Sequence, residues 1–199
     1  MTGLFDGKDH PTLWLMRHGE TVWNAAGRMQ GRLDSPLTGR GREQASEQQN
    51  LLTAETLPDD LSLWTSPLGR ARETAAIVFS GLGRPVTEDA RLTEISVGAC
   101  EGLTLAEIKA EFPRLFQPDR PWAWHAEAPG GEGEAAFRAR VESFLSGLTG
   151  PAAIVTHGMT SRMIRGVILG LDWAGMARLP GGQGNIHRVS NRRAEVLAA

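Results

Sequence analysis

Leu13-Trp14-Leu15-Met16-Arg17-His18-Gly19-Glu20-Thr21 is a short apolar run that ends abruptly in charged and polar residues. An apolar run of this length that is bounded by glycine predicts a buried strand. Open α/β sheets bind their ligands just beyond the carboxyl ends of the strands. Arginine carries a planar charged fork that suits phosphate, and histidine can act as a nucleophile or transfer a proton near neutral pH. The stretch therefore indicates an α/β fold with a site for phosphoryl chemistry.

Strand-like and helix-like segments alternate along the rest of the chain, and this predicts a three-layer α/β/α fold with a mostly parallel central sheet. We expect strands at Leu13–Met16, Leu61–Thr65 and Ala152–Thr156, and weaker ones at Arg84–Glu88, Ile186–Val189 and Ala194–Leu197. We expect helices at Thr38–Leu52, Ser66–Ser80, Leu105–Phe112, Glu132–Leu148 and Met159–Leu169. The Ser66-Pro67 pair predicts the start of its helix, because it places a capping residue directly before a proline at the first helical position.

The length of 199 residues predicts a single domain over residues 1–199, since it suffices for one sizeable core and is short for two. Residues 113–133 contain four prolines, three glycines, Trp122 and Trp124, which predicts a long surface loop. A loop of this length in a small domain is often a lid or a substrate loop, and a packed surface loop is the alternative.

Composition and charge exclude several classes of protein. The net charge of -2 argues against a nucleic-acid partner. No window approaches the roughly 18 apolar residues of a membrane span, and Met1 to Pro11 lacks the apolar core of a secretory signal. Cys100 is the only cysteine, so neither an intrachain disulfide nor a paired-cysteine metal site is possible. We therefore expect a cytoplasmic enzyme.

Three predicted strands end in a similar way. The first is followed by Arg17-His18-Gly19, the second by Ser66-Pro67-Leu68-Gly69-Arg70, and the third by His157-Gly158. The carboxyl ends of parallel strands meet at one edge of a sheet, and helices that begin there attract anions. Taken singly, such a histidine is usually structural and such an arginine is usually solvated. Their recurrence at three strand ends predicts a cationic pocket for a phosphoryl group.

With these residues identified, the chain resembles the histidine phosphatase superfamily in its phosphoglycerate-mutase-like branch. The resemblance runs from Leu13 to about Val189 and rests on blocks that follow one another in the expected order. These blocks are Arg17-His18-Gly19-Glu20-Thr21-Val22-Trp23-Asn24, Gln30-Gly31, Asp34-Ser35-Pro36-Leu37-Thr38 with Gly41, Ser66-Pro67-Leu68-Gly69-Arg70-Ala71-Arg72-Glu73-Thr74-Ala75, Leu92-Thr93-Glu94 with Gly98 and Glu101-Gly102, Pro129-Gly130-Gly131-Glu132, and Val155-Thr156-His157-Gly158.

The resemblance implies a role for each site residue. His18 is expected to be the nucleophile that carries the phosphoryl group as phosphohistidine. Arg17 and Arg70 are expected to hold the nonbridging oxygens, with His157 completing the cage. Glu94 is expected to protonate the leaving oxygen and then to activate water. Substrate contacts are also expected at three smaller residues, Asn24, Gly31 and Gly158. No metal and no cofactor are implied, because fixed cations supply the charge that a metal could supply.

Glu94 is chosen over its acidic neighbours by the resemblance. Glu88, Asp89 and Glu101 lie nearby, and a solvated carboxylate is the ordinary state of any one of them. Only the spacing of Glu94 to Gly98 and to Glu101-Gly102, as the resemblance supplies it, selects Glu94.

Three functions fit these residues. The first is a metal-independent phosphomonoesterase that acts on a small phosphorylated metabolite. The second is a cofactor-dependent phosphoglycerate mutase, and the third is a catalytically silent phosphate sensor. The mostly apolar segment Ile95-Ser96-Val97-Gly98-Ala99-Cys100 and the scattered basic residues Lys109, Arg114 and Arg120 depart from the mutase pattern and favour a phosphatase.

The sequence leaves open which residues line the outer part of the site and whether the protein forms a homodimer. Trp23, Trp122 and Trp124 could line an outer pocket, or they could be buried in the core. An exposed Trp173 could support a homodimer. The segment Asn185-Ile186-His187-Arg188 has no assigned role.

Overall fold

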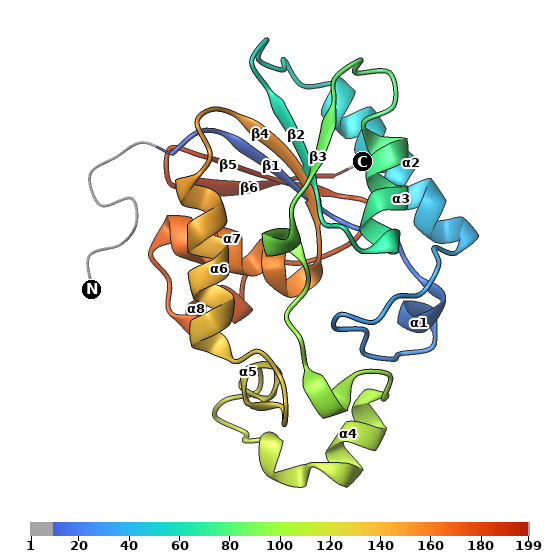
Figure 1. Ribbon diagram of the computed structural model, residues 1–199, viewed down its shortest axis with the longest axis vertical. Helices are drawn as coiled ribbons and strands as arrows, with labels where there is room; N and C mark the ends of the chain where they lie inside the picture. The colour runs from blue at the N-terminus through green and yellow to red at the C-terminus, as the bar shows by residue number, and fades with distance from the viewer. Residues whose placement is uncertain (1–9, 199) are drawn as a thin grey trace.

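The computed structural model describes residues 10–198, which form one six-stranded sheet with helices on both faces (Figure 1). The strands are β1 (Leu13–Arg17), β2 (Ser62–Thr65), β3 (Val86–Glu88), β4 (Ala152–Thr156), β5 (Ile186–Ser190) and β6 (Arg193–Leu197). The α-helices are α1 (Val22–Ala25), α2 (Gly39–Thr53), α3 (Gly69–Val78), α4 (Leu105–Glu111), α5 (Trp124–Glu127), α6 (Glu134–Ser146), α7 (Gly158–Leu169) and α8 (Trp173–Ala177). Short 3₁₀ turns are η1 (Ala90–Leu92), η2 (Gly98–Cys100) and η3 (Pro113–Leu115).

The sheet has the strand order β3-β2-β4-β1-β5-β6. The first four strands in this order run parallel, whereas β5 and β6 are antiparallel to their neighbours. The predicted α/β/α architecture with a mostly parallel sheet is therefore confirmed.

The apolar run Leu13–Met16 forms most of β1, which lies at the centre of the sheet and is covered on both faces. Leu13 and Leu15 pack into the core beneath α6 and α7, while Trp14 and Met16 pack into the core beneath α2 and α3. A parallel strand that is buried on both faces needs a continuous apolar run rather than an alternating one.

The parallel register brings the predicted strand ends together. Arg17 at the end of β1 lies opposite Thr156 at the end of β4, and Thr65 of β2 lies opposite Val155 of β4. All three strands therefore deliver their following residues to one edge of the sheet.

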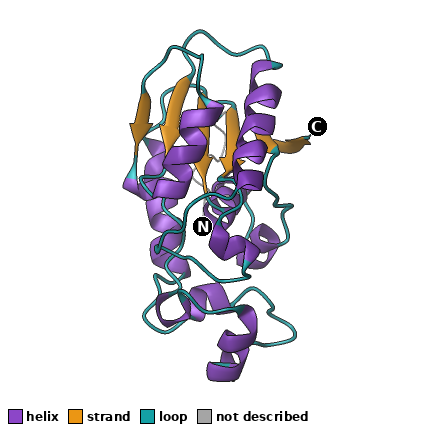
Figure 2. Cartoon of the chain, turned by 90° about the vertical axis from the view of Figure 1, so that its right-hand side faces the viewer, coloured by secondary structure: helices purple, strands orange, loops and turns teal. Residues whose placement is uncertain are grey.

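A small helical cap covers this edge. The segment that carries α4, η3 and α5 extends beyond the sheet (Figures 1 and 2). The prediction that residues 113–133 form a loop is therefore wrong in part, since the segment holds η3 and α5. Trp124 and Ala128 are buried here, so apolar packing orders a segment whose prolines predicted irregular structure.

The predicted start of the second helix at Ser66-Pro67 is wrong. α3 begins at Gly69, and its N-cap residue is Leu68. The Ser66 N–H continues the sheet ladder by donating to the Val155 carbonyl over 3.0 Å, and its hydroxyl accepts from the Leu68 N–H at 3.3 Å, so the chain turns before the helix begins. The shift leaves the Ser66 hydroxyl available to the site.

Trp173 is not the exposed residue that a dimer contact would need. It is partly buried against the main core, and its ring meets Phe137 edge-on with 6.5 Å between the centroids. The expected homodimer therefore has no support from this side chain.

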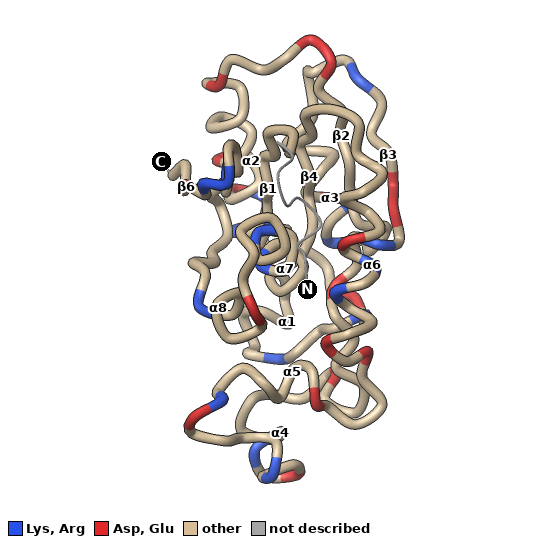
Figure 3. The backbone as a smooth tube through the Cα atoms, turned by 90° about the vertical axis from the view of Figure 1, so that its left-hand side faces the viewer, with Lys and Arg blue, Asp and Glu red and all other residues tan. Residues whose placement is uncertain are grey.

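Charge is spread over the outer elements, and both signs occur along the side shown in Figure 3. Within residues 10–198, no helix has the length and apolar character needed to cross a membrane. The same residues contain no group of three or more His, Cys, Asp or Glu side chains placed to hold a metal ion. The prediction about a secretory signal falls largely on residues 1–9, which lie outside the described part of the chain.

Candidate active site

His18 follows β1 and is buried at the carboxyl edge of the sheet, with 3% of its surface exposed. Its Nδ1 lies 2.8 Å from the Gly19 carbonyl oxygen. Because a carbonyl oxygen only accepts, Nδ1 must carry the proton, and Nε2 then carries the lone pair. The tight backbone turn that makes this contact requires glycine at position 19, since a side chain there would collide with the backbone of Gly41.

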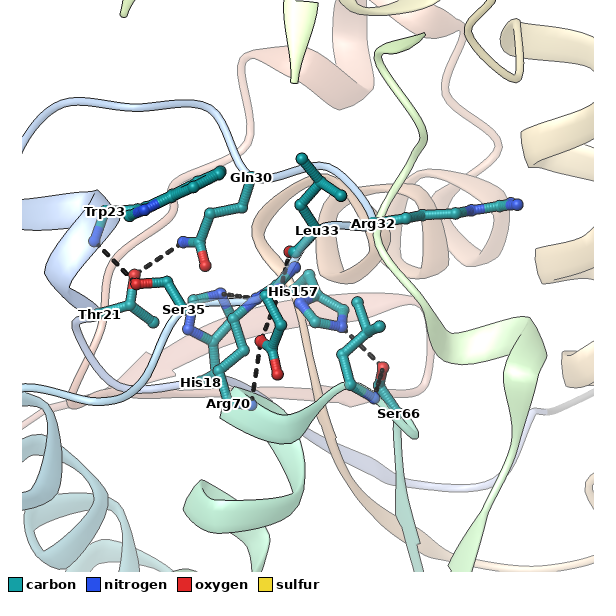
Figure 4. A network of polar contacts seen from close by, with 12 residues as sticks. His18, Thr21, Trp23, Gln30, Arg32, Leu33, Ser35, Ser66, Arg70 and His157 are labelled. Carbon is teal, nitrogen blue, oxygen red and sulfur yellow. Dashed lines mark hydrogen bonds and ion pairs between the residues drawn. The ribbon is translucent and has the colours of Figure 1, made fainter. Parts of the chain in front are cut away.

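Arg70 enters from the first turn of α3 and faces Nε2 of His18 (Figure 4). Its Nε–H donates to that nitrogen over 3.3 Å. The remaining nitrogens donate to the carbonyls of Gly31 and Leu33 over 2.8 and 2.7 Å, and Nη1 also pairs with the Asp34 carboxylate at 3.0 Å. Arg70 is thus buried but held in a single orientation by fixed acceptors.

Two further groups complete the ring around His18. The Arg17 side chain borders the cavity and has no hydrogen-bond or ion-pair partner among residues 10–198, and its Nε is buried. The ring of His157 lies 5.2 Å from that of His18, and its Nε2 contacts the Ser66 hydroxyl at 2.7 Å (Figure 4). His157 Nδ1 is buried without a partner in the described chain. Buried polar atoms without partners are costly, so both atoms suit a bound anion.

Glu94 lies at the amino terminus of α7, beside Arg17. Its Oε2 accepts from the Met159 N–H over 3.1 Å. Its Oε1 accepts from the backbone N–H groups of Ile95 and Thr160, both at 3.1 Å, while the Thr160 hydroxyl donates to the Thr93 carbonyl at 2.7 Å. Oε2 therefore has one protein donor and Oε1 has two, which leaves Oε2 freer to exchange a proton.

Carboxylates of the protein lie at the amino termini of α3 and α7, where the sequence predicted an anion. The Arg70 N–H of α3 donates to Asp34 over 3.3 Å, and the Met159 and Thr160 N–H groups of α7 donate to Glu94. These carboxylates interact favourably with the positive ends of both helices.

Burial and positive neighbours change the ionisation of both histidines. Burial, followed by the guanidinium groups of Arg17 and Arg70, holds the pKa of His18 well below its ordinary value of 6.5. Burial and the charge of Arg70 lower the pKa of His157 in the same way. His18 is therefore neutral near pH 7, and its ring lone pair, on Nε2, accepts the Arg70 Nε–H in this structure.

The three smaller predicted residues also border the cavity. The Asn24 Oδ1 accepts from the Thr21 N–H at 3.3 Å and from Gln183 Nε2 at 3.2 Å, so this side chain fixes the loop after His18. Gly31 contributes its carbonyl to Arg70 rather than an N–H to a ligand. A side chain at Gly158 would lie 3.6 Å from Arg17 Nε and 3.7 Å from Glu94 Oε2, so glycine keeps the space between these groups open.

The cavity of about 210 Å³ continues outward between the cap and α7. Trp122 and Trp124 line it, as one alternative predicted, and His125 and Arg162 lie beside them. Trp23 lies elsewhere, with its indole next to Gly102.

Several site residues could not be identified from the sequence. Asp34 orients Arg70, Ser66 contacts His157, and Gln183 joins Asn24 to the His18 carbonyl at 3.1 Å. Arg140 donates to the Glu94 carbonyl over 3.1 Å and pairs with Glu132, which ties the loop of Glu94 to α6. Asp34, Ser66 and Glu132 fall within the recognised blocks, but their contacts are long-range. Gln183 carries no such signal.

The fold and the site together define an α/β protein with a histidine nucleophile candidate in a cationic cage at the carboxyl edge of its sheet. The model of the histidine phosphatase superfamily, branch 1, matches residues 13–196, so the chain belongs to this superfamily. Its members are phosphatases and mutases, and the chain is accordingly a phosphoryl-transfer enzyme.

Relatives within the superfamily carry different names. A Salmonella choleraesuis protein named "Probable phosphoglycerate mutase GpmB" is 31% identical over 199 residues, which cover 94% of this chain and 88% of that protein. The alpha-ribazole phosphatase from Shigella flexneri is similar in structure, with a TM-score of 0.77, 29% identity and coverage of 94% and 95% of the two chains. The mycobacterial glucosyl-3-phosphoglycerate phosphatase has a TM-score of 0.80, 29% identity and coverage of 95% and 99%.

Proposed function

We propose that the protein is a metal-independent phosphomonoesterase that acts through a phosphohistidine at His18 on a small phosphorylated metabolite. The observation that carries this proposal is the state of His18, whose Nδ1 is fixed on the Gly19 carbonyl and whose Nε2 lone pair lies among cationic side chains. A neutral imidazole that is oriented in this way is an activated nucleophile.

In the first step, His18 Nε2 attacks phosphorus and the bond to the leaving oxygen breaks. Arg17 and Arg70 hold the nonbridging oxygens; the Arg70 Nε–H passes from His18 Nε2 to one of these oxygens, which frees the lone pair for attack. The unpartnered Nδ1 of His157 is available to a third contact. Such fixed donors stabilise the charge that spreads over the transferring group. Glu94 enters protonated, and Oε2 gives its proton to the leaving oxygen, so that an alcohol departs.

In the second step, water attacks the phosphohistidine. Glu94, which is now ionised, takes a proton from this water, and the bond between phosphorus and Nε2 breaks. Inorganic phosphate leaves, and both His18 and Glu94 return to their starting states. Each proton is accounted for without a metal ion or a second substrate.

Mutase activity is the second candidate, and the name of the Salmonella choleraesuis relative favours it. A mutase must return the phosphoryl group to a bound phosphoglycerate rather than to water. Ile95 and Val97 form an apolar wall beside Glu94, which suits a leaving group with an apolar part better than a small acid that is charged throughout, and this supports the phosphatase.

The test is to trap the intermediate and to follow its fate. The protein is mixed with an aryl phosphate in the presence of a chelator, quenched in alkali, and the peptide that carries His18 is examined by mass spectrometry. A phosphorylated His18 with release of inorganic phosphate is expected, and both should disappear in His18→Ala. Turnover that survives this substitution would contradict the proposal. Isomer formed from 3-phosphoglycerate with bisphosphoglycerate would favour the mutase, whereas phosphate binding without turnover of any ester would favour the silent sensor.

A further inference from the structure

The cavity beyond the phosphoryl cage has an aromatic wall with a guanidinium group against it. The ring of Trp122 lies 5.5 Å from that of His125, which lies 3.7 Å from that of Trp124. The guanidinium carbon of Arg162 lies 5.6 Å from the Trp122 ring centroid. None of these four side chains has a part in the two steps described above.

Arg162 uses few of its N–H donors within the described part of the chain. Its Nε donates to the Leu179 carbonyl over 3.0 Å, and Nη1 reaches the Gly158 carbonyl only at 3.5 Å. No ion pair with a carboxylate is recorded for Arg162 among residues 10–198, in contrast to Arg70. A guanidinium group has five N–H donors, so most of them stay available to a ligand.

Arg162 is also aimed at the site. It lies four residues beyond Gly158 on α7, about 6 Å along the helix axis. Helical side chains lean toward the amino terminus, which here is the end that holds Glu94 and the phosphoryl cage. The guanidinium therefore faces the path by which a leaving group would extend from a bound phosphoryl group.

His125 adds a neutral polar group to the wall. Burial lowers its pKa to about 4, and its Nδ1 contacts the Trp122 carbonyl at 3.3 Å. The carbonyl accepts, so Nδ1 carries the proton. Because its pKa is about 4, the ring is neutral near pH 7 and does not repel or attract a ligand by charge. Of the two arginines that border the cavity outside the phosphoryl cage, Arg28 pairs with Glu107, whereas Arg162 forms no ion pair among residues 10–198 and is acted on by the charge of Glu94 at longer range.

We propose that Arg162 and Trp122 form a leaving-group subsite, which selects phosphomonoesters whose leaving group has a flat or apolar part followed by an anionic group. The inference rests on the proposed phosphatase function and deepens it. The flat part lies against the indole, and the anion pairs with the guanidinium. The cavity volume of about 210 Å³ limits the leaving group to a small molecule, because typical ligand pockets measure roughly 300–1,000 Å³.

The test uses two esters that differ only in charge at the far end of one ring, namely 4-(carboxymethyl)phenyl phosphate and its neutral amide, 4-(carbamoylmethyl)phenyl phosphate. Their phenol leaving groups are closely matched, so the ratio of their kcat/KM values reports recognition of the carboxylate. We expect the wild-type protein to prefer the carboxylate at least tenfold. Arg162→Gln should bring the ratio close to one, mainly through a higher KM for the carboxylate, and Arg162→Lys should keep part of the preference.

Arg114→Gln is the matched control, because it removes the same charge from an exposed residue of the cap that does not border the cavity. This variant should keep the wild-type ratio. A wild-type ratio near one, or an Arg162→Gln variant that keeps the preference, would overturn the subsite.

A binding measurement distinguishes failure of this proposal from failure of the proposed function. The affinities of the corresponding carboxylate and amide benzylphosphonates, which cannot be hydrolysed, are measured by calorimetry. A preference for the carboxylate that depends on Arg162 supports the subsite even if neither ester is hydrolysed, and in that case only the phosphatase proposal fails. Hydrolysis of both esters without preference overturns only the subsite.

Discussion

The Nε–H of Arg70 donates a hydrogen bond to Nε2 of His18 over 3.3 Å. This contact places a buried cation directly on the nitrogen that we propose as the nucleophile. It holds the imidazole in the tautomer that attack requires. It also makes the guanidinium fork, rather than positive charge alone, the feature that matters at position 70.

We expect Arg70→Lys to lower kcat/KM for an aryl phosphate by about 10²–10³-fold, the usual cost of losing one preorganised donor at a transition state. Lysine keeps the charge but cannot contact His18, Gly31 and Leu33 together. Arg72→Lys is the control, since Arg72 lies on the same helix with 60% of its side chain exposed. Similar activity in the two variants would contradict a role for the fork.

Asp34→Asn should have a smaller effect that acts through Arg70. Asp34 is 41% exposed, and the carbonyls of Gly31 and Leu33 still hold the guanidinium when its charge is removed. We expect a loss of roughly tenfold or less in kcat/KM, because exposed ion pairs contribute about 0–1 kcal/mol. Asp119→Asn serves as the control. A loss as large as that in Arg70→Lys would mean that Asp34 acts on the reaction directly.

Glu94→Gln tests the proposed acid by varying the leaving group. General acid catalysis contributes typically about 10²–10⁴-fold, and it matters most when the leaving oxygen is basic. We expect a large loss with an alkyl phosphate and a much smaller loss with p-nitrophenyl phosphate. Glu88→Gln, at an exposed carboxylate nearby, should change neither rate. Equal losses with both esters would instead indicate that Glu94 only caps α7.

Buried histidines should make the fold sensitive to acid. Burial lowers the pKa of His125 and of His187 to about 4, against 6.5 in an unfolded chain, and the pKa values of His18 and His157 move in the same direction. The unfolded state then binds more protons between pH 6.5 and 4, so the free energy of unfolding should fall as pH falls through this range. The limit is about 1.4 kcal/mol per pH unit for each histidine.

Urea unfolding between pH 7.5 and 4.5 measures this dependence. His187→Gln removes one titrating group that lies away from the reaction, and it should therefore flatten the curve below pH 6.5. A variant with the same pH dependence as the wild-type protein would exclude His187 from this effect.

The sequence predicted the layers and the central strands well, because their signals are local. The apolar run of β1 reflects burial on both faces, and the predicted strand Ala152–Thr156 coincides with β4. The start of α3 was predicted wrongly because Ser66 pairs with Val155, a partner from a distant strand that no local signal reveals. Residues 113–133 were predicted wrongly in part because burial of Trp124 orders a short helix there.

The sequence by itself determined which groups are present: an arginine and a histidine after β1, an arginine in α3, a histidine after β4, and the family that these blocks define. Only the tertiary structure decided what each group does to its neighbours. It placed Arg70 on His18 Nε2, brought Asp34 and Glu94 to the amino termini of α3 and α7, and left Arg162 without an ion pair among residues 10–198. The physical reason is that chain-local chemistry fixes strands and turns, whereas tautomers, ion pairs and cavity walls depend on contacts between residues far apart in the chain.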